Sequence, residues 1–113
     1  MNAFPKRGEV WLVNWNPARG SELAGKRPAL VVQNDIGNEH AATTIVAAIS
    51  TAIRLFPMNV LLDPPHGGLN KPSIVKAGQI LTVSKDRLEK RLGVVEQKKM
   101  EEVDRALRLS LSL

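Results

Sequence analysis

The sequence predicts a mainly β protein: a small barrel of five to six antiparallel strands with a short helix and a C-terminal helix. Short runs rich in β-branched residues alternate with Gly, Pro and Asn, which is typical of short strands joined by turns. A helical spacing of apolar residues is sustained only near the C-terminus. The chain has 113 residues, the size of a single domain, which we expect to span residues 1–113.

Six runs are expected to form the strands, and turn-forming residues close most of them. Asn16-Pro17 ends the first run and Asp63-Pro64-Pro65 ends the fourth, because proline cannot donate to a strand ladder. The fifth run is interrupted at Gly78, where we expect a bend. The expected strands cover residues 9–15, 29–33, 43–50, 58–62, 73–75 continued by 79–83, and 92–95.

Two helices are expected after the fifth strand. Ser84 as an N-cap, Asp86 in the first turn and Gly93 beyond the end predict a short helix over residues 85–91. The second helix is expected over residues 97–110, with one apolar stripe that packs on the sheet. The stripe consists of Met100, Val103, Leu107 and Leu111, and the other face carries the pairs Glu101 with Arg105 and Asp104 with Arg108.

The charge of the chain favours a polyanionic partner. Sixteen Lys and Arg face eleven Asp and Glu, a formal net charge of +5. Nucleic acid, an anionic membrane surface or an acidic protein segment would suit this charge, and so would no specific partner at all. The absence of cysteine excludes a disulfide framework, a thiolate nucleophile and a cysteine-based zinc site. No apolar run has the length of a membrane span or a signal peptide, so we expect a cytoplasmic protein.

The connection between the first two expected strands carries the densest chemistry. Residues 19–28 read Arg-Gly-Ser-Glu-Leu-Ala-Gly-Lys-Arg-Pro. A turn between strands needs only residues that allow tight backbone angles. This segment adds a carboxylate, a hydroxyl and three cations, which are the groups that hold and activate a phosphodiester.

The order of motifs along the chain resembles the MazF/PemK (Kid) family of toxin endoribonucleases. The specific signal is Gly-Ser-Glu-x-x-Gly-x-Arg-Pro between two strands, here residues 20–28. Weaker matches flank it and extend the resemblance over nearly the whole chain. They are Arg-Gly-Glu-Val at residues 7–10, the runs 29–35, 44–50 and 79–83, Asp86-Arg87-Leu88 and the final helix.

The resemblance implies an SH3-like barrel of the CcdB/MazF kind, normally a homodimer. It implies cleavage of single-stranded RNA, including mRNA, at short sequence motifs, with no metal or other cofactor. The adjacent 2′-hydroxyl acts as nucleophile, which leaves a 2′,3′-cyclic phosphate and a 5′-hydroxyl. It also implies a cognate, MazE-like antitoxin whose acidic tail occupies the RNA groove.

Arg27 is the first candidate for catalysis. Pro28 biases it to an extended backbone, and the strand that follows fixes its position. A guanidinium can contact two phosphoryl oxygens at once while negative charge builds on them. The family places its essential arginine here. Since arginine is a poor base, we favour charge stabilisation, with proton donation to the leaving oxygen as a second role. The alternative is an ordinary surface arginine at a strand start.

Glu22 is the candidate base that takes the 2′-hydroxyl proton, a role that some family members assign to a glutamate at this position. The other interpretation is a salt bridge from Glu22 to Lys26 or Arg27 that orders the segment. The residues alone do not choose between the two.

Ser50 is the candidate that positions the scissile phosphate, where the family commonly has threonine. Thr51 is its rival. Because side chains alternate along a strand, the two cannot both face the site. Thr51 shares its face with residues that we expect in the core, so we choose Ser50, unless a bulge shifts the register. The core residues in question are Ile45, Ala47 and Ile49.

Further residues of the segment are expected to contact RNA without reacting. Arg19 and Lys26 supply cations for flanking phosphates. Ser21 shapes the turn, and Gly25 allows the backbone to approach a ligand closely.

Later in the chain, Lys71 belongs to a loop over residues 63–71 that suits an RNA-contacting or antitoxin-contacting flap, or an ordinary hairpin. Gln79 is expected either to line the RNA groove or to have a structural role. Leu23 replaces a glutamine frequent in the family, which would alter base preference, antitoxin contact or only local packing.

Three other interpretations stay open. His40 and His66 could act as base and acid in a two-histidine nuclease, although both lie in expected loops. A gyrase poison like CcdB would need a Trp-Gly-Ile terminus, whereas this chain ends Leu-Ser-Leu at residues 111–113. The third is an RNA-binding module without catalysis. Trp11 and Trp15 share one strand face, where packing is favoured over stacking on bases. No Asp, Glu and His spacing indicates a metal site.

Overall fold

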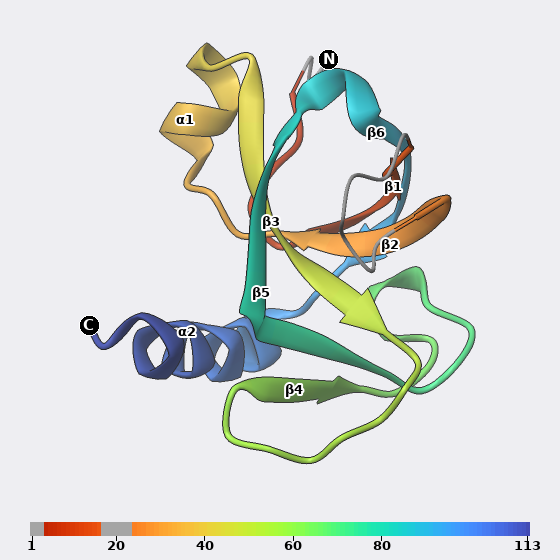
Figure 1. Ribbon diagram of the computed structural model, residues 1–113, viewed down its shortest axis with the longest axis vertical. Coiled ribbons are helices and arrows are strands. Elements are labelled where there is room, and N and C mark those ends of the chain that lie inside the picture. Colours follow the sequence, from red (N-terminus) through yellow and green to blue (C-terminus); the bar gives the residue numbers. More distant parts are fainter. Residues whose placement is uncertain (1–3, 17–23) are drawn as a thin grey trace.

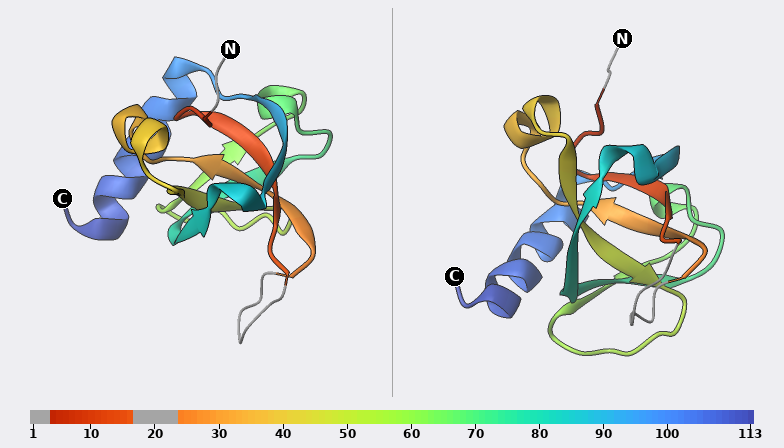
Figure 2. Two further views of the ribbon diagram at one scale, coloured as in Figure 1. Left: turned by 90° about the horizontal axis from the view of Figure 1, so that it is seen from above. Right: turned by 45° about the horizontal axis from the view of Figure 1, so that its top comes forward.

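The computed structural model describes residues 4–16 and 24–113 and shows one antiparallel sheet that curls into a small barrel (Figure 1). The six strands follow the order β4-β5-β3-β2-β1-β6. A C-terminal helix lies across one end of the barrel, as all three views show (Figures 1 and 2). The mainly β fold with a final helix is therefore confirmed. The elements are β1 (Glu9–Asn14), β2 (Lys26–Val31), α1 (Asp35–His40), β3 (Thr43–Ser50), β4 (Asn59–Leu62), η1 (His66–Gly68), β5 (Ser73–Ser84), η2 (Lys85–Arg87), β6 (Leu88–Val94) and α2 (Gln97–Leu111).

The predicted helix over residues 85–91 is wrong. Ser84 does cap a turn, since its hydroxyl accepts the backbone N–H of Asp86, but the turn is only the 3-10 segment η2. The chain then enters β6, which pairs antiparallel with β1 from Leu88 to Val94. A strand ladder with a distant partner thus overrides the local helix signals.

A short helix that sequence patterns did not reveal follows β2. Asn34 caps α1 by accepting the backbone N–H of Gly37 at 2.9 Å. Asn38 is fully buried, and its side-chain amide donates to the carbonyl of Gln33 while its oxygen accepts the hydroxyl of Thr44. These hydrogen bonds satisfy a buried amide and fix α1 against the start of β3.

The predicted bend at Gly78 is confirmed, within one continuous strand. Ala47 of β3 pairs with Ile80 of β5, but the next residue, Ala48, pairs with Lys76. Residues 77–79 therefore have no partner on β3, and β5 turns sharply at this point (Figure 1). Extra residues on one strand bend it and increase its twist. Past the bend, the first half of β5 pairs with β4.

Both faces of the central strands are buried. One core cluster includes Leu30, Ala47 and Ile49 together with the residues of α2 that face the sheet. The second cluster lies on the opposite face and includes Ala29, Val46 and Ala48. The expectation that only one face of β3 is core was therefore incomplete. The residues of α2 that join the first cluster are Met100, Val103, Ala106 and Leu107.

The apolar stripe of α2 is shorter than predicted. Leu111 is 55% exposed because it lies in the last turn, beyond the sheet, while Ala106 is buried. The i,i+4 pairs are also wrong: within the described ranges, the ion pair of Asp104 is with Arg7, at 2.7 Å, and Glu101 has none with Arg105. The partner comes from the other end of the chain, which helical spacing cannot reveal.

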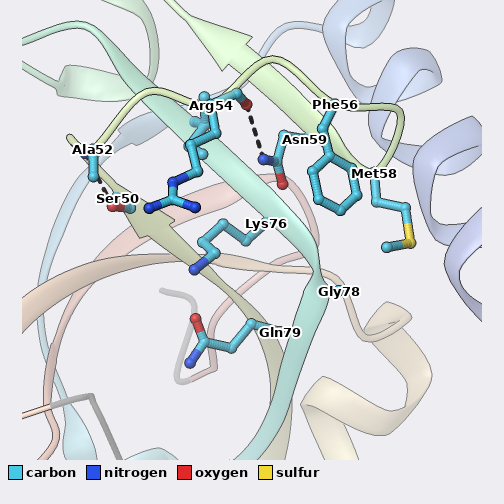
Figure 3. Close-up of a pocket in the computed structure, with 10 residues that line it drawn as sticks. Ser50, Ala52, Arg54, Phe56, Met58, Asn59, Lys76, Gly78 and Gln79 are labelled. Carbon is cyan, nitrogen blue, oxygen red and sulfur yellow. Dashed lines mark hydrogen bonds between the residues drawn. The ribbon is translucent and has the colours of Figure 1, made fainter.

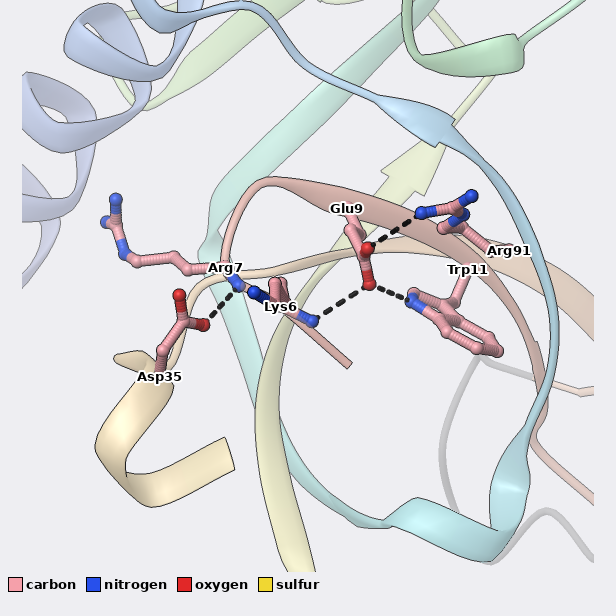
Figure 4. Close-up of polar contacts among 6 residues, drawn as sticks. All are labelled: Lys6, Arg7, Glu9, Trp11, Asp35 and Arg91. Atoms are coloured by element: carbon pink, nitrogen blue, oxygen red, sulfur yellow. Dashed lines mark hydrogen bonds and ion pairs between the residues drawn. The ribbon is translucent and has the colours of Figure 1, made fainter. Parts of the chain in front are cut away.

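The N-terminal segment anchors three elements at once. The carboxylate of Glu9 is 6% exposed and accepts the backbone N–H of Lys6, the indole N–H of Trp11 and a guanidinium N–H of Arg91 (Figure 4). The backbone N–H of Arg7 donates to Asp35 at 2.7 Å. A buried carboxylate with three donors is stable because its charge is fully hydrogen-bonded.

Within the described ranges, no helix combines the length and the apolar character that a membrane crossing requires.

Gly93 should not tolerate a side chain. A Cβ at this position would lie 2.5 Å from the carbonyl carbon of Gly67 and from the nitrogen of Gly68, because the two backbones are in direct contact. We expect Gly93→Ala to lower the free energy of unfolding by roughly 1–3 kcal/mol, measured by denaturant titration. Gly78→Ala is the matched control, since its Cβ would meet only Met58 at 3.5 Å. Equal stabilities of the two variants would contradict this packing.

Asp35 should make the free energy of unfolding depend on pH in the acid range. The backbone N–H of Arg7, which donates to the Asp35 carboxylate, lowers the pKa of Asp35, and the Asn38 amide acts in the same direction. A carboxyl with a lowered folded pKa stabilises the fold above its unfolded pKa of about 3.9. This stabilisation is lost as the pH falls through the folded value. Asp35→Asn should therefore be less stable than wild type at pH 7, and it should lose less stability than wild type when the pH is lowered from 5. Urea titrations at several pH values measure both proteins, and identical pH profiles would argue against the contact.

Candidate functional site

A groove of about 770 Å³ lies where the end of β3, the β3–β4 loop and the bend of β5 meet (Figure 3). It combines two cations, two amides, a hydroxyl and apolar side chains. The described lining contains no carboxylate. The lining residues are Ser50, Ala52, Arg54, Phe56, Met58, Asn59, Ile74, Lys76, Gly78 and Gln79.

Strand register explains how these residues come together. Lys76 pairs with Ala48 on one side and with Asn59 of β4 on the other, so all three share a face of the sheet. Ser50 pairs with Ile74 one step along the same face. The bend of β5 then brings Gln79 to the groove as well (Figure 3).

The cations of the groove have no neutralising partner among the described residues. Within residues 4–16 and 24–113, neither Arg54 nor Lys76 makes an ion pair. Figure 3 shows both charged ends directed into the groove. Two like charges close to a partly buried surface repel each other, and an anion that binds between them removes that repulsion.

The loop between β3 and β4 is held in place by its own hydrogen bonds. The side-chain amide of Asn59 donates to the carbonyl of Arg54 at 2.9 Å, and its backbone N–H donates to the carbonyl of Phe56. Ser50 Oγ accepts the backbone N–H of Ala52 at 3.1 Å, which leaves its proton for a ligand. Phe56 is 49% exposed and offers an aromatic surface on which a base can stack.

Arg27 lies on the same face of the sheet as the groove but is not part of its lining. It pairs with Val13 of β1 and shares its face with Ala29, the partner of Ala48. Its side chain is exposed, and Nε donates to the carbonyl of Ala24 at 3.0 Å. The second strand was predicted over residues 29–33, with Arg27 just before it, but β2 begins at Lys26 and so includes Arg27.

The other predicted RNA-contacting residues are dispersed. Gln79 lines the groove with Ser50, whereas Thr51 and Lys71 are exposed and lie outside it. Lys26 forms an ion pair with Glu89 of β6 at 2.9 Å.

Gly25 adopts a φ of +72°, which favours glycine, and a Cβ there would meet no atom within 4 Å. The predictions for Arg19, Ser21, Leu23 and Glu22 concern positions outside the described residues.

The histidines and tryptophans serve other contacts. His66 accepts the backbone N–H of Glu96, and His40 on α1 lies 3.7 Å from Glu39; neither lines the groove. Trp15 is 8% exposed in the second core cluster. Among the described residues, no cluster of three or more potential metal ligands occurs.

Sequence reasoning missed both cations of the groove. Lys76 had a usable signal, because it is the one charged residue in the apolar run over residues 73–83, three positions before Gln79. Arg54 had none, since its position depends on how the β3–β4 loop folds back over β5.

Comparison with known proteins assigns this chain to a family. A family model described as PemK-like, MazF-like toxin of type II toxin-antitoxin system matches residues 6–111. Endoribonuclease EndoA of Bacillus subtilis is 41% identical over 110 residues, covering 96% of this chain and 95% of that protein.

Similar solved structures support the same family assignment. An endoribonuclease in complex with its cognate antitoxin from Mycobacterial species is 30% identical, with a TM-score of 0.83 and 96% of each chain covered. MazF from Deinococcus radiodurans shares the fold, with a TM-score of 0.83 at 22% identity, covering 99% of this chain and 100% of that one. The expected resemblance is confirmed: this chain belongs to the PemK-like, MazF-like toxin family of type II toxin–antitoxin systems.

Proposed function

We propose that this protein is the toxin of a type II toxin–antitoxin pair and cleaves single-stranded RNA at short sequence motifs. The observation that carries the proposal is the groove, in which Arg54 and Lys76 lack neutralising partners among the described residues and Ser50 offers a hydroxyl. The adjacent aromatic Phe56 suits an unpaired base better than a stacked duplex. Membership of the toxin family supports the same activity.

The proposed reaction needs no group that the chain lacks. The ribose 2′-oxygen attacks the phosphorus and forms the cyclic 2′,3′-phosphate, while the bond from phosphorus to the 5′-oxygen breaks. Glu22 takes the 2′-hydroxyl proton, and the departing 5′-oxygen takes a proton from the Arg27 guanidinium or from water and leaves as a hydroxyl.

Arg27 and Ser50 are assigned to the phosphate. The guanidinium of Arg27 stabilises the negative charge that grows on the non-bridging oxygens, and Ser50 donates a hydrogen bond to one of them. Arg54 and Lys76 hold neighbouring phosphates, together with Arg19. Gln79 and Asn59 offer amides to base edges, and Ser21, Gly25, Thr51 and Lys71 are assigned to further RNA contacts.

We further propose that residues 1–113 act as one toxin domain in the cytoplasm, where mRNA is available, and that two copies assemble as a homodimer. A MazE-like antitoxin inhibits it by placing an acidic tail in the groove, because carboxylates compete with phosphates for Arg54 and Lys76. Beside the cations, Ile53, Leu55 and Phe56 are exposed apolar side chains that such a tail can cover.

Arg27→Ala should abolish cleavage and leave assembly intact. Loss of the charge that stabilises the transition state should lower the rate by at least about a hundredfold. The assay is incubation with a long defined RNA in EDTA, with 5′ ends mapped by sequencing, and size-exclusion chromatography checks the dimer. Arg105→Ala on the exposed face of α2 is the control of equal charge. Undiminished cleavage by the Arg27 variant would sink its catalytic role.

Lys76→Met should weaken binding rather than chemistry. Removing one phosphate contact should reduce the slope of log affinity against log salt concentration by about 0.7, the value for a single strand. An RNA with 2′-deoxyribose at the mapped cleavage site keeps the substrate intact during fluorescence anisotropy titrations. Lys98→Met, exposed on α2, removes the same charge away from the groove. Equal salt slopes for the two variants would show that Lys76 does not bind phosphate.

A further inference from the structure

Arg87 makes a contact that none of the proposed chemistry uses. It belongs to the turn η2, yet its guanidinium crosses to the end of β1, more than seventy residues earlier in the chain. One nitrogen, Nη1, donates to the carbonyl of Asn14 at 3.0 Å and to the carbonyl of Asn16. The side chain is half-buried in this position.

Strand pairing explains why these carbonyls need a donor. The β1–β6 ladder reaches Val13 paired with Leu88, which is the first residue of β6. Asn14 and Asn16 lie beyond that last pair, where no residue of β6 faces them. The guanidinium of Arg87, one residue before the strand, supplies the N–H groups that the ladder no longer provides.

The same junction joins the two ends of the connection between β1 and β2, which contains the candidate base Glu22 and is followed by Arg27. The backbone N–H of Trp15 donates to the carbonyl of Gly25 at 2.8 Å, and the backbone N–H of Gly25 donates to the side chain of Asn16 at 3.0 Å. Asn14 accepts the backbone N–H of Asn16 through its own side chain. The chain thus leaves β1 and returns to β2 through one hydrogen-bonded closure.

Arg27 is tied to this closure. Its Nε donates to the carbonyl of Ala24, the residue next to Gly25. A continuous path of hydrogen bonds and single peptide links therefore runs from Arg87 through Asn16 and Gly25 to the guanidinium of Arg27. A charged donor at its start is stronger than a neutral one and holds its acceptors in a fixed plane.

We propose that Arg87 is a positioning residue for cleavage: it locks the closure between residues 14–16 and 24–25 and thereby orients Arg27 toward the reacting phosphate. The inference rests on the proposed ribonuclease activity. Arg87 acts on kcat through the geometry of Arg27 and contributes little to RNA affinity, because its Nη1 donates to two backbone carbonyls that hold the guanidinium at the end of β1.

Kinetics on an RNA with a mapped cleavage site test the proposal. We expect Arg87→Met to lower kcat about tenfold to a hundredfold, the effect of a displaced catalytic group, with little change in KM. Affinity for the 2′-deoxy RNA and its salt slope should match wild type. Arg87→Lys, which keeps a charged donor, should recover part of kcat. Arg105→Met is the control for the lost charge and should behave as wild type.

Amide hydrogen exchange separates a local effect from general loosening. In Arg87→Met, exchange should accelerate at Trp15 and Gly25, whose N–H groups close the junction, and stay unchanged in β3 and α2. Faster exchange throughout the chain would overturn the positioning role.

Other outcomes are equally decisive. A raised KM with a reduced salt slope would assign Arg87 to phosphate binding instead, and wild-type kcat in Arg87→Met would refute the proposal while the ribonuclease activity stood. If wild-type protein left RNA uncut, the proposed function itself would fail.

Discussion

The antiparallel pairing of β3 with a bent β5 is the constraint on which the rest of the structure depends. A ladder with equal steps on both strands would keep β5 straight. Residues 77–79 have no partner on β3, so β5 must turn, and its first half then pairs with β4. This turn curls the sheet, gives α2 a surface to cover and opens the groove at the strand ends (Figures 1 and 3).

The groove shows how a small fold can keep charge near its core. Ala48 is buried in the second core cluster, and its partner across the ladder is Lys76. A buried core residue and a cationic residue of the groove are therefore direct neighbours on adjacent strands. Burial of a lysine stem against apolar residues leaves its ammonium at the rim, where a phosphate or a carboxylate can reach it. The proposed substrate and the proposed inhibitor would be attracted by the same charges, so each would exclude the other from the groove.

A second constraint acts at the ends of the segment over residues 17–23. The two ends are held by backbone and side-chain hydrogen bonds at residues 14–16 and 24–25, and Arg87 reaches them from the far side of β1. Catalytic groups on a connection between strands gain precision when a rigid scaffold fixes the positions where that connection starts and ends. In this fold the scaffold includes a side chain from the other half of the sequence.

The sequence by itself determined the mainly β class, the strand over residues 43–50, the bend at Gly78 and the final helix, because each rests on local alternation, helical spacing or a single glycine. It also predicted phosphate chemistry for the segment over residues 19–28 and for Ser50, and the proposed function keeps that prediction. Tertiary structure alone decided that residues 88–94 form a strand, that Asp104 pairs with Arg7, and that Arg54 and Lys76 meet in one groove. The physical reason is the same in each case. These contacts join residues far apart in the chain, and their free energy appears only when the sheet has formed, so no local pattern records them.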